Sequence, residues 1–378
     1  MKFIKIFIFI PIIVLGQTTV NLPEKKIKLL FAGDLMNHGP QIKSAYVDSL
    51  QIYDYSENFV FLRTILSNSD LAFVNLETTL GIKPFTGYPN FSAPSEIAAE
   101  ASKLGFNVFV TANNHSCDKN KTGIIKTLDI LDKFNIIHSG TYRNKKERDS
   151  LTPLFIEKKG FKLALLNYSY GTNRIKIPYP TKVNLIDTIQ IKKDLIKTKK
   201  LQPDEIIVFL HWGTQYQNKA NIRQKKLAKW LHNNGVNLVI GSHPHVIQPI
   251  DIQRSTNNNL KAITIYSLGN FISNQRIFPR DGSMLVSLEL SKIDEQTYIS
   301  KIKVIPIWVY KYKQKNKFHY TVLPIEDFKF QPTFFQTNSD YQKMMKYYKH
   351  FLSFGFNKLL QKPLILEFSP IEYKKIMD

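Results

Sequence analysis

Cysteine is almost missing from this sequence of 378 residues, and so is any long hydrophobic run. Because Cys117 is the single cysteine, no disulfide can form within the chain, which is compatible with a periplasm but does not require one. The apolar stretch at residues 6–15 is too short for a comfortable membrane span, and no later segment reads as one. The sequence therefore excludes a fold stabilised by internal disulfides and gives no sign of several membrane-spanning segments.

Acidic residues are also scarce: 30 Asp and Glu stand against 52 Lys and Arg, which gives a formal net charge of +22. A basic balance of this size favours anionic partners, such as polycarboxylates, phosphate esters or teichoic-type polymers. The alternative is a solvated, lysine-rich surface without a dedicated partner. The sequence contains neither an aromatic-interleaved basic motif nor a zinc-finger spacing, so nucleic acid is not expected as a partner.

The amino-terminal residues have the pattern of a secretory signal. Lys2 and Lys5 flank the start of the chain, an apolar run follows over residues 6–15, and the small residue Gly16 comes next. We therefore predict a signal peptide over residues 1–16 and export to the periplasm or cell envelope. The alternative is an uncleaved N-terminal anchor.

The remaining chain, with 43% hydrophobic residues overall, can bury a real core. Short β-branched and aromatic runs alternate with amphipathic patterns, which is typical of an α/β fold. The predicted strands are 26–32, 70–74, 107–111, a hairpin of 153–156 with 162–167, 205–210, 246–252, 262–266, 284–290 and 303–309. The predicted helices are 55–66, 95–104, 122–134, 185–197, 222–233 and 340–360. We predict a catalytic domain over residues 26–312 and a C-terminal helical extension, residues 313–378, that packs on it.

Polar residues stand where several of these apolar runs end. In an open α/β sheet, the loops at the carboxyl ends of the strands converge on one crevice, so these residues are expected to meet. A two-metal hydrolase needs hard or borderline ligands for each ion, with one bridging carboxylate. The candidate ligands are Asp34, Glu77, Asn114, His211, His243 and His245.

Three histidines in these segments leave alternatives open. His243 and His245 would point to opposite sides of an extended strand, whereas a turn at Pro244 would aim both rings at two neighbouring metals. His115, directly after a candidate ligand, suits a catalytic role without coordination, as proton donor or charge stabiliser. A single buried histidine is more often structural, but the ordered set indicates a metal site.

Six ordered segments resemble the CapA family of capsule and poly-γ-glutamate synthesis proteins, which is similar to the calcineurin-like metallophosphoesterases. They are Gly33-Asp34-Leu35-Met36, Asn75-Leu76-Glu77, Ala112-Asn113-Asn114-His115, His211-Trp212-Gly213, Gly241-Ser242-His243-Pro244-His245 and Ser267-Leu268-Gly269-Asn270-Phe271. The resemblance runs from about residue 28 to residue 271 and implies a four-layer β-sandwich flanked by helices, with the metal site at its edge.

The resemblance also implies a role for each matching position. Asp34 and His245 would hold the first metal, and Glu77 would bridge. Asn114, His211 and His243 would hold the second metal, and His115 would be the catalytic histidine. The ions would be one or two divalent metals, with Mn, Zn, Fe and Mg as candidates.

The sequence departs from the wider pattern at several positions. Met36 replaces the histidine of an Asp-x-His motif, and a thioether is a poor ligand for hard ions. Gln215 stands where the family commonly has glutamate. Asp118 is expected to cap the helix at residue 122. Substrate contacts are predicted for His38, Trp212, Gln215 and Asn270. The alternatives are metal ligation for His38, a place in the core for Trp212 and turn capping for Asn270.

The expected function is that of an exported, metal-dependent hydrolase in the synthesis or processing of capsule poly-γ-glutamate or a related anionic polymer. Its substrate would be an anionic polymer or a phosphate-containing molecule, and a membrane-bound polymer synthase is a candidate partner. One alternative is a non-catalytic, polymer-binding or synthase-associated subunit with a vestigial metal pocket. The other is a phosphodiesterase or phosphatase of the wider superfamily.

Overall fold

The computed structural model describes residues 24–256, 260–293 and 295–360. The predicted signal peptide, residues 1–16, lies outside the described residues, and so does the end of the predicted extension. In the described ranges, no helix has the length and apolar character needed to cross a membrane.

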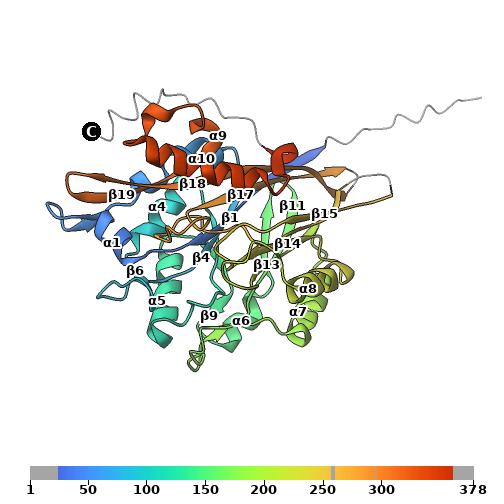
Figure 1. The fold of residues 1–378 in the computed structure, drawn as a ribbon. Coiled ribbons are helices and arrows are strands. Elements are labelled where there is room, and N and C mark those ends of the chain that lie inside the picture. The colour runs from blue at the N-terminus through green and yellow to red at the C-terminus, as the bar shows by residue number, and fades with distance from the viewer. Residues whose placement is uncertain (1–23, 257–259, 294, 361–378) are drawn as a thin grey trace, which may run out of the picture.

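One large sheet of thirteen strands runs through the described chain (Figure 1). One half of it is parallel and consists of β1 (Lys25–Leu35), β4 (Leu71–Leu76), β7 (Val108–Val110) and β8 (Ile137–Ser139). The other half consists of β10 (Leu154–Lys158), β11 (Phe161–Ser169), β13 (Glu205–His211), β14 (Leu238–Ser242), β16 (Leu260–Ile265) and β15 (Ile250–Arg254). The long antiparallel strands β17 (Gly282–Ile293) and β18 (Gln296–Gln314) join the halves, and β19 (Lys317–Pro324) pairs with β18.

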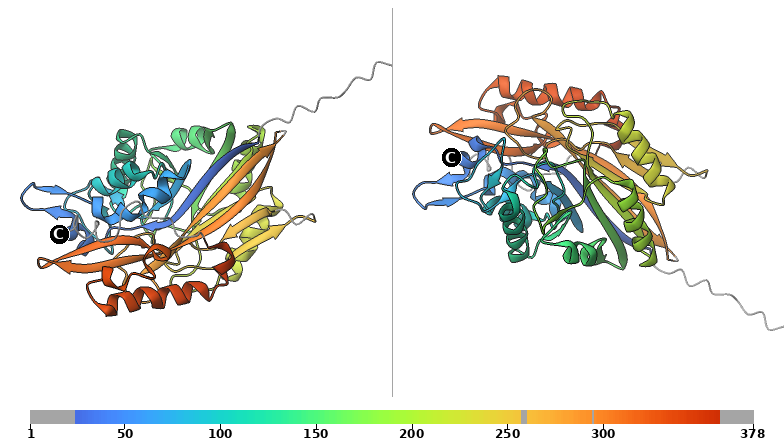
Figure 2. Two further views of the ribbon diagram at one scale, coloured as in Figure 1. Left: turned by 90° about the horizontal axis from the view of Figure 1, so that it is seen from above. Right: turned by 90° about the horizontal axis from the view of Figure 1, so that it is seen from below.

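The two halves of this sheet share one core. Phe31 and Phe73 from the first half belong to the same apolar cluster as Phe209 and Ile240 from the second. Helices cover the two outer faces, and the teal and yellow-green helices lie on different sides of the strands (Figure 2). They are α3 (Arg63–Ser67), α4 (Glu96–Leu104) and α5 (Asn120–Lys133) on one face, and α7 (Thr188–Lys200) and α8 (Ile222–Asn233) on the other. This order of layers confirms the predicted α/β, four-layer β-sandwich.

The smaller elements lie around this sandwich. In the described residues, two-stranded ribbons pair β2 (Tyr46–Val47) with β3 (Ile52–Tyr53), β5 (Thr79–Leu80) with β6 (Ser92–Ala93), and β9 (Thr141–Tyr142) with β12 (Lys182–Val183). The short helices are α1 (Gly39–Ala45), α6 (Lys145–Leu151) and α9 (Ile325–Phe328).

The predicted helix over residues 55–66 is interrupted. It divides into α2 (Ser56–Phe59), a 3-10 turn (Val60–Leu62) and α3. Phe59 and Leu62 pack in the outer core under α4, whereas Phe61 packs in the core between the sheet halves. The segment thus lies between two cores, and the tighter turn lets neighbouring side chains enter both.

The C-terminal part continues the sheet before it becomes helical. The division predicted between residues 312 and 313 falls inside β18, which ends at Gln314. Helix α10 (Asn338–Leu352) packs Tyr347 and Phe351 into the main core, which also contains Trp308. The predicted helix 340–360 ends early because Gly355 adopts a left-handed conformation (φ 77°) before a 3-10 turn (Phe356–Leu359).

Candidate metal centre

The six predicted ligands lie together at the carboxyl ends of parallel strands. Asp34 is near the end of β1, His211 ends β13, and the other four lie in the loops directly after β4, β7 and β14. All six are buried, with exposed fractions of 3% or less. Residues separated by more than two hundred positions therefore meet because their strands share one edge of the sandwich.

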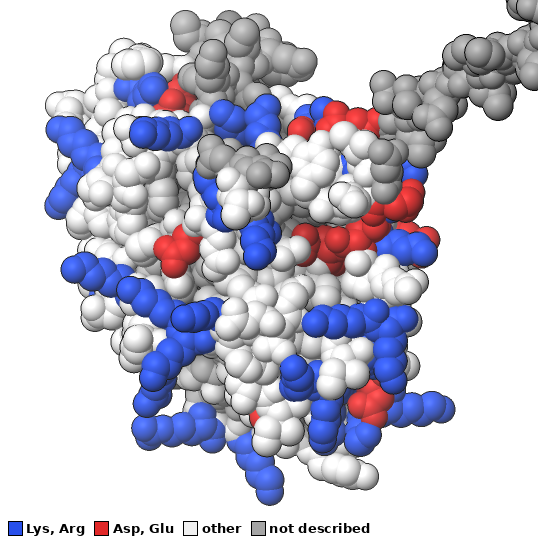
Figure 3. All heavy atoms as spheres, turned by 90° about the vertical axis from the view of Figure 1, so that its right-hand side faces the viewer, with Lys and Arg blue, Asp and Glu red and all other residues white. Residues whose placement is uncertain are grey.

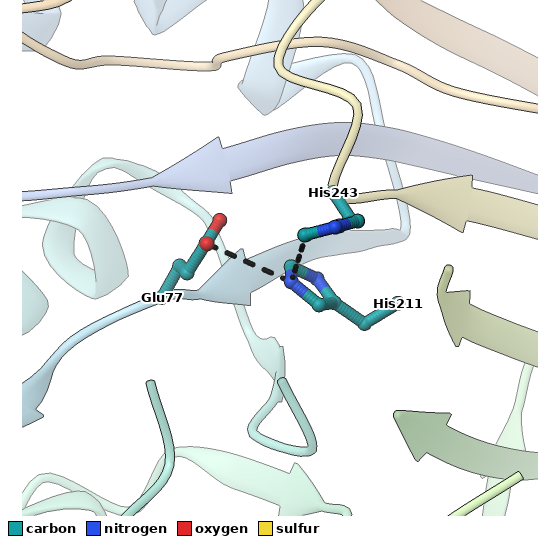
Figure 4. A group of neighbouring side chains, drawn as sticks. All are labelled: Glu77, His211 and His243. Atoms are coloured by element: carbon teal, nitrogen blue, oxygen red, sulfur yellow. Dashed lines mark hydrogen bonds and ion pairs between the residues drawn. The ribbon is translucent and has the colours of Figure 1, made fainter. Parts of the chain in front are cut away.

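The ligand atoms form two groups that share one carboxylate. Glu77, His211 and His243 form the first group, and Asp34, Glu77 and His245 form the second, with ligand atoms within 4.8 Å of one another in each group. Figure 4 shows the first of these groups, with the ring of His211 between the other two side chains. Glu77 Oε1 lies 3.6 Å from His211 Nε2 and 3.9 Å from His245 Nε2. Asn114 Oδ1 lies 2.6 Å from His211 Nε2, which places it with the first group.

The charges of this cluster fit divalent cations. Both oxygens of Glu77 are buried and have no hydrogen-bond partner in the described part of the chain. Burial, and next the charge of Asp34, raise the pKa of Glu77 well above its usual range. Burial lowers the pKa of His211 far below its ordinary value and that of His243 to about 3, so both imidazoles are neutral. Two buried carboxylates beside neutral imidazoles lack positive charge, which one or two metal ions would supply.

The backbone around Pro244 decides which of the two predicted orientations the rings of His243 and His245 adopt. His243 (φ 98°) and His245 (φ 58°) both adopt positive φ values, so the segment turns rather than continuing β14. The rings therefore reach different ligand groups, and the His243 N–H donates to Asp34 Oδ2 at 3.3 Å. The predicted strand 246–252 is shortened by this turn, and β15 begins only at Ile250.

Two side chains that sequence reasoning gave no role orient the ligands. Asn75 Nδ2 donates to Asp34 Oδ1 at 2.8 Å and lies 3.2 Å from His211 Nδ1. Ser242 Oγ lies 3.0 Å from the same His211 nitrogen. Such contacts fix the rotation of a ligating ring and are typical of metal sites. A polar residue within the otherwise apolar strand β4 was the signal for Asn75.

His115 lies beside the cluster and is held by a carboxylate. Its Nδ1 is 2.7 Å from Asp118 Oδ2, which also accepts the Phe91 N–H at 2.7 Å. The prediction that Asp118 caps the following helix is therefore wrong, because Lys119 occupies the N-cap of α5 and Asp118 turns toward the site. His115 Nε2 lies 4.0 Å from Glu77 Oε1.

A cavity of about 980 Å³ opens above the cluster. His38 and Gln215 line it, as does Met36. Trp212 does not line it: its indole N–H donates to the Tyr266 carbonyl at 2.9 Å and the ring is buried under α8, which corrects the predicted substrate contact. Asn270 is also fully buried, and its Oδ1 lies 3.0 Å from His245 Nδ1, so it positions a ligand instead of touching substrate.

Comparisons with known proteins find relatives of this chain. Residues 28–275 match the family model of the bacterial capsule synthesis protein PGA_cap. The capsule biosynthesis protein CapA of Bacillus anthracis is 28% identical over 300 residues, which cover 75% of this chain and 68% of that protein. The PGA biosynthesis protein CapA of Bacillus subtilis is 27% identical over 277 residues, covering 69% and 67%.

Among solved structures, the calcineurin-like phosphoesterase YfkN of Bacillus subtilis has a TM-score of 0.43 and 12% identity, covering 88% of this chain and 99% of that one. A phosphatase from Mycoplasma pneumoniae has a TM-score of 0.40 and 16% identity, covering 76% and 95%. Likeness of this degree carries no argument about activity. The family model, however, matches more than half of the chain. The chain therefore belongs to the bacterial capsule synthesis protein family, PGA_cap.

Proposed function

We propose that this protein is a metal-dependent hydrolase of the cell envelope that acts in the synthesis or processing of an anionic capsule polymer, poly-γ-glutamate or a relative of it. The observation that carries the proposal is the buried carboxylate of Glu77, shared by two ligand groups at the floor of a large cavity. The relatives named for capsule biosynthesis and PGA biosynthesis support the polymer context. Export and work beside a membrane-bound polymer synthase are further parts of this proposal.

In this proposal each ligand group holds one divalent ion. When bound, such ions polarise a phosphoryl or carbonyl oxygen and lower the pKa of a nearby water. Asp34 and His245 would hold one ion, Asn114, His211 and His243 would hold the other, and Glu77 belongs to both groups of candidate ligands. A set of imidazole, amide and carboxylate ligands suits Mn, Zn or Fe better than Mg.

His115 supplies the proton in the proposed reaction. Asp118 Oδ2 accepts a hydrogen bond from the Nδ1–H of His115, and the other ring nitrogen, Nε2, faces the cluster. A proton on Nε2 can then pass to the leaving group as the scissile bond breaks. Asp118 acts as a positioning residue because it touches His115 and lies away from the cavity lining.

The charge of the surface supports an anionic substrate. On the face that carries α7 and α8, Lys and Arg cover much of the lower part, while Asp and Glu gather in few places (Figure 3). Together with the net charge of +22, this distribution attracts polyanions over long range.

A second candidate function, a non-catalytic polymer-binding subunit, is favoured by two positions. Met36 lines the cavity where a ligand would stand in an Asp-x-His motif, and it is 1% exposed. Gln215 brings a neutral amide to within 3.5 Å of His245 Nε2. At these two positions the chain therefore has a thioether and an amide in place of a potential metal ligand and a potential base.

Metal analysis combined with two histidine variants tests these functions. We expect one or two metal ions per chain in the wild type, in His115→Asn and in His138→Asn. The control is matched because His138 Nε2 also contacts a carboxylate, Asp132 Oδ1 at 2.9 Å, but does so far from the cluster. Hydrolysis of bis(p-nitrophenyl) phosphate and of poly-γ-glutamate should fall by about 10²- to 10⁴-fold in His115→Asn alone.

The outcomes separate the two functions. Bound metal without turnover of either substrate in the wild type would favour the polymer-binding subunit. Equal turnover in the two variants would show that His115 is not the proton donor.

A further inference from the structure

The loop over residues 273–280 forms one wall of the cavity above the metal centre, and the sequence analysis assigned it nothing. This loop connects the Ser267–Phe271 segment to β17. Two of its residues, Arg276 and Arg280, line the cavity. None of the residues lining this cavity is Asp or Glu. The two carboxylates of the cluster lie below, fully buried. An anion entering the cavity therefore meets two guanidinium groups on this wall, while Asp281, which contacts Arg276, is not part of the lining.

Arg280 is fixed close to the metal ligands. Its guanidinium lies 3.4 Å from the centroid of the Tyr216 ring, and that ring lies 5.9 Å from the His245 ring. The Arg280 carbonyl accepts a hydrogen bond from Asn270 Nδ2 at 3.0 Å, while Asn270 Oδ1 contacts His245 at 3.0 Å. A single amide side chain thus ties the backbone of Arg280 to a ligand. Among the described residues no ion pair involves Arg280, so its guanidinium, stacked on Tyr216 in the cavity lining, keeps its charge for a ligand.

Arg276 adds a second, deeper cation. Its Nη1 is buried and has no hydrogen-bond partner in the described part of the chain. Its Nη2 lies 3.9 Å from Asp281 Oδ2, a loose pair because that oxygen also accepts the Trp308 indole N–H at 3.0 Å. Arg276 lines the cavity, and beside this loose pair its guanidinium keeps positive charge that an incoming oxyanion would neutralise.

We propose that Arg280 and Arg276 form an anion subsite that binds a second, non-reacting carboxylate or phosphate of the substrate, beside the group positioned at the metal centre. The inference rests on the proposed function, because it assigns the substrate class of the same cavity. A substrate that fills both positions carries an anion next to its scissile group, as a polyanionic chain does. Arginine suits this role because its planar fork binds two oxygens of a carboxylate or phosphate while stacking on an aromatic ring.

Calorimetric binding to the full chain tests the subsite without requiring turnover. The probes are a γ-linked glutamate hexamer and inorganic tripolyphosphate, which separate a carboxylate from a phosphate as the bound anion. We expect Arg280→Gln to raise the Kd of the preferred probe by about tenfold or more, the loss typical of a charge-assisted contact. Arg280→Lys should show an intermediate loss, because it keeps the charge but not the stacked fork. Arg276→Gln should weaken binding as well, with its fold checked by circular dichroism.

The matched control is Arg223→Gln on the exposed surface of α8, which removes the same charge away from the cavity. A Kd for Arg280→Gln within twofold of that for Arg223→Gln would overturn the subsite, and so would a wild type that binds neither probe. Metal content and phosphodiester hydrolysis of the wild type are measured separately. Arginine-dependent binding without hydrolysis would support the subsite and overturn the hydrolase, whereas hydrolysis with arginine-independent binding would do the reverse.

Discussion

Replacing Glu77 by glutamine should uncouple the stability of this protein from divalent metal. In the metal-free chain, burial and the neighbouring Asp34 raise the pKa of Glu77 well above its usual range, which favours the neutral carboxyl. Glutamine has nearly the same shape and is also neutral, so the metal-free variant should melt within about 1 °C of the wild type. With metal present, the wild type gains a bridging carboxylate that the variant cannot provide.

The size of the effect follows from binding linkage. At a metal concentration of about 100 times Kd, binding stabilises the folded state by about 2.7 kcal/mol. An unfolding entropy of about 2.1 cal/mol/K per residue, over 378 residues, amounts to ~0.8 kcal/mol/K, so the melting temperature should rise by ~3 °C. If the variant binds metal about 100-fold more weakly, the gain falls to about 0.4 kcal/mol, which is less than 1 °C.

Differential scanning fluorimetry with Mn²⁺ or Zn²⁺ titrations measures both quantities. Glu205→Gln is the matched control, because Glu205 is also a buried carboxylate but accepts hydrogen bonds from the Ile206 N–H at 2.9 Å and from Asn237 Nδ2 at 3.3 Å, outside the cluster. It should keep the full metal-induced shift. A Glu77→Gln protein that keeps the wild-type shift would refute the bridging role, and equal loss in the control would show that the shift does not report on this cluster.

Three further outcomes can be measured. Asp118→Asn should lower kcat about 10- to 100-fold with metal content unchanged, because a neutral amide replaces the carboxylate that holds the ring of His115; an unchanged kcat would contradict this. Burial raises the pKa of Glu205 from 4.5 to about 7, so the folded chain keeps a proton that the unfolded chain releases. Stability should therefore fall by up to about 3 kcal/mol as pH rises from 4.5 to 7, a slope that Glu205→Gln should flatten in urea titrations. Gly33→Ala would place a Cβ 1.8 Å from the Gly269 carbonyl oxygen that accepts the Asp34 N–H, so urea unfolding should show a loss of at least about 2 kcal/mol, together with weaker metal binding.

Much of the site was predictable because it depends on local pattern. Apolar runs such as residues 205–210 mark buried strands, and the polar residue that follows each run must lie at the carboxyl edge of the sheet. That rule brought Asp34, His211 and His243 together without any knowledge of long-range contacts. Other predictions failed where a side chain after a strand could point either into the cavity or into the core. Trp212 follows a strand as the ligands do, but it turns to the outer core under α8.

The sequence by itself determined the alternation of strands and helices, the placement of the six candidate ligands at strand ends and the basic charge, because each is fixed by residue type and short-range spacing. The tertiary structure alone decided that Asp118 turns toward His115, that Asn75 orients two ligands, and that the loop over residues 273–280 brings Arg280 over Tyr216. These contacts depend on how turns are directed when the two sheet halves pack together. The periodicity of apolar residues carries no information about the direction of a turn. The contacting residues are brought together by packing across the fold and not by regular spacing along the chain.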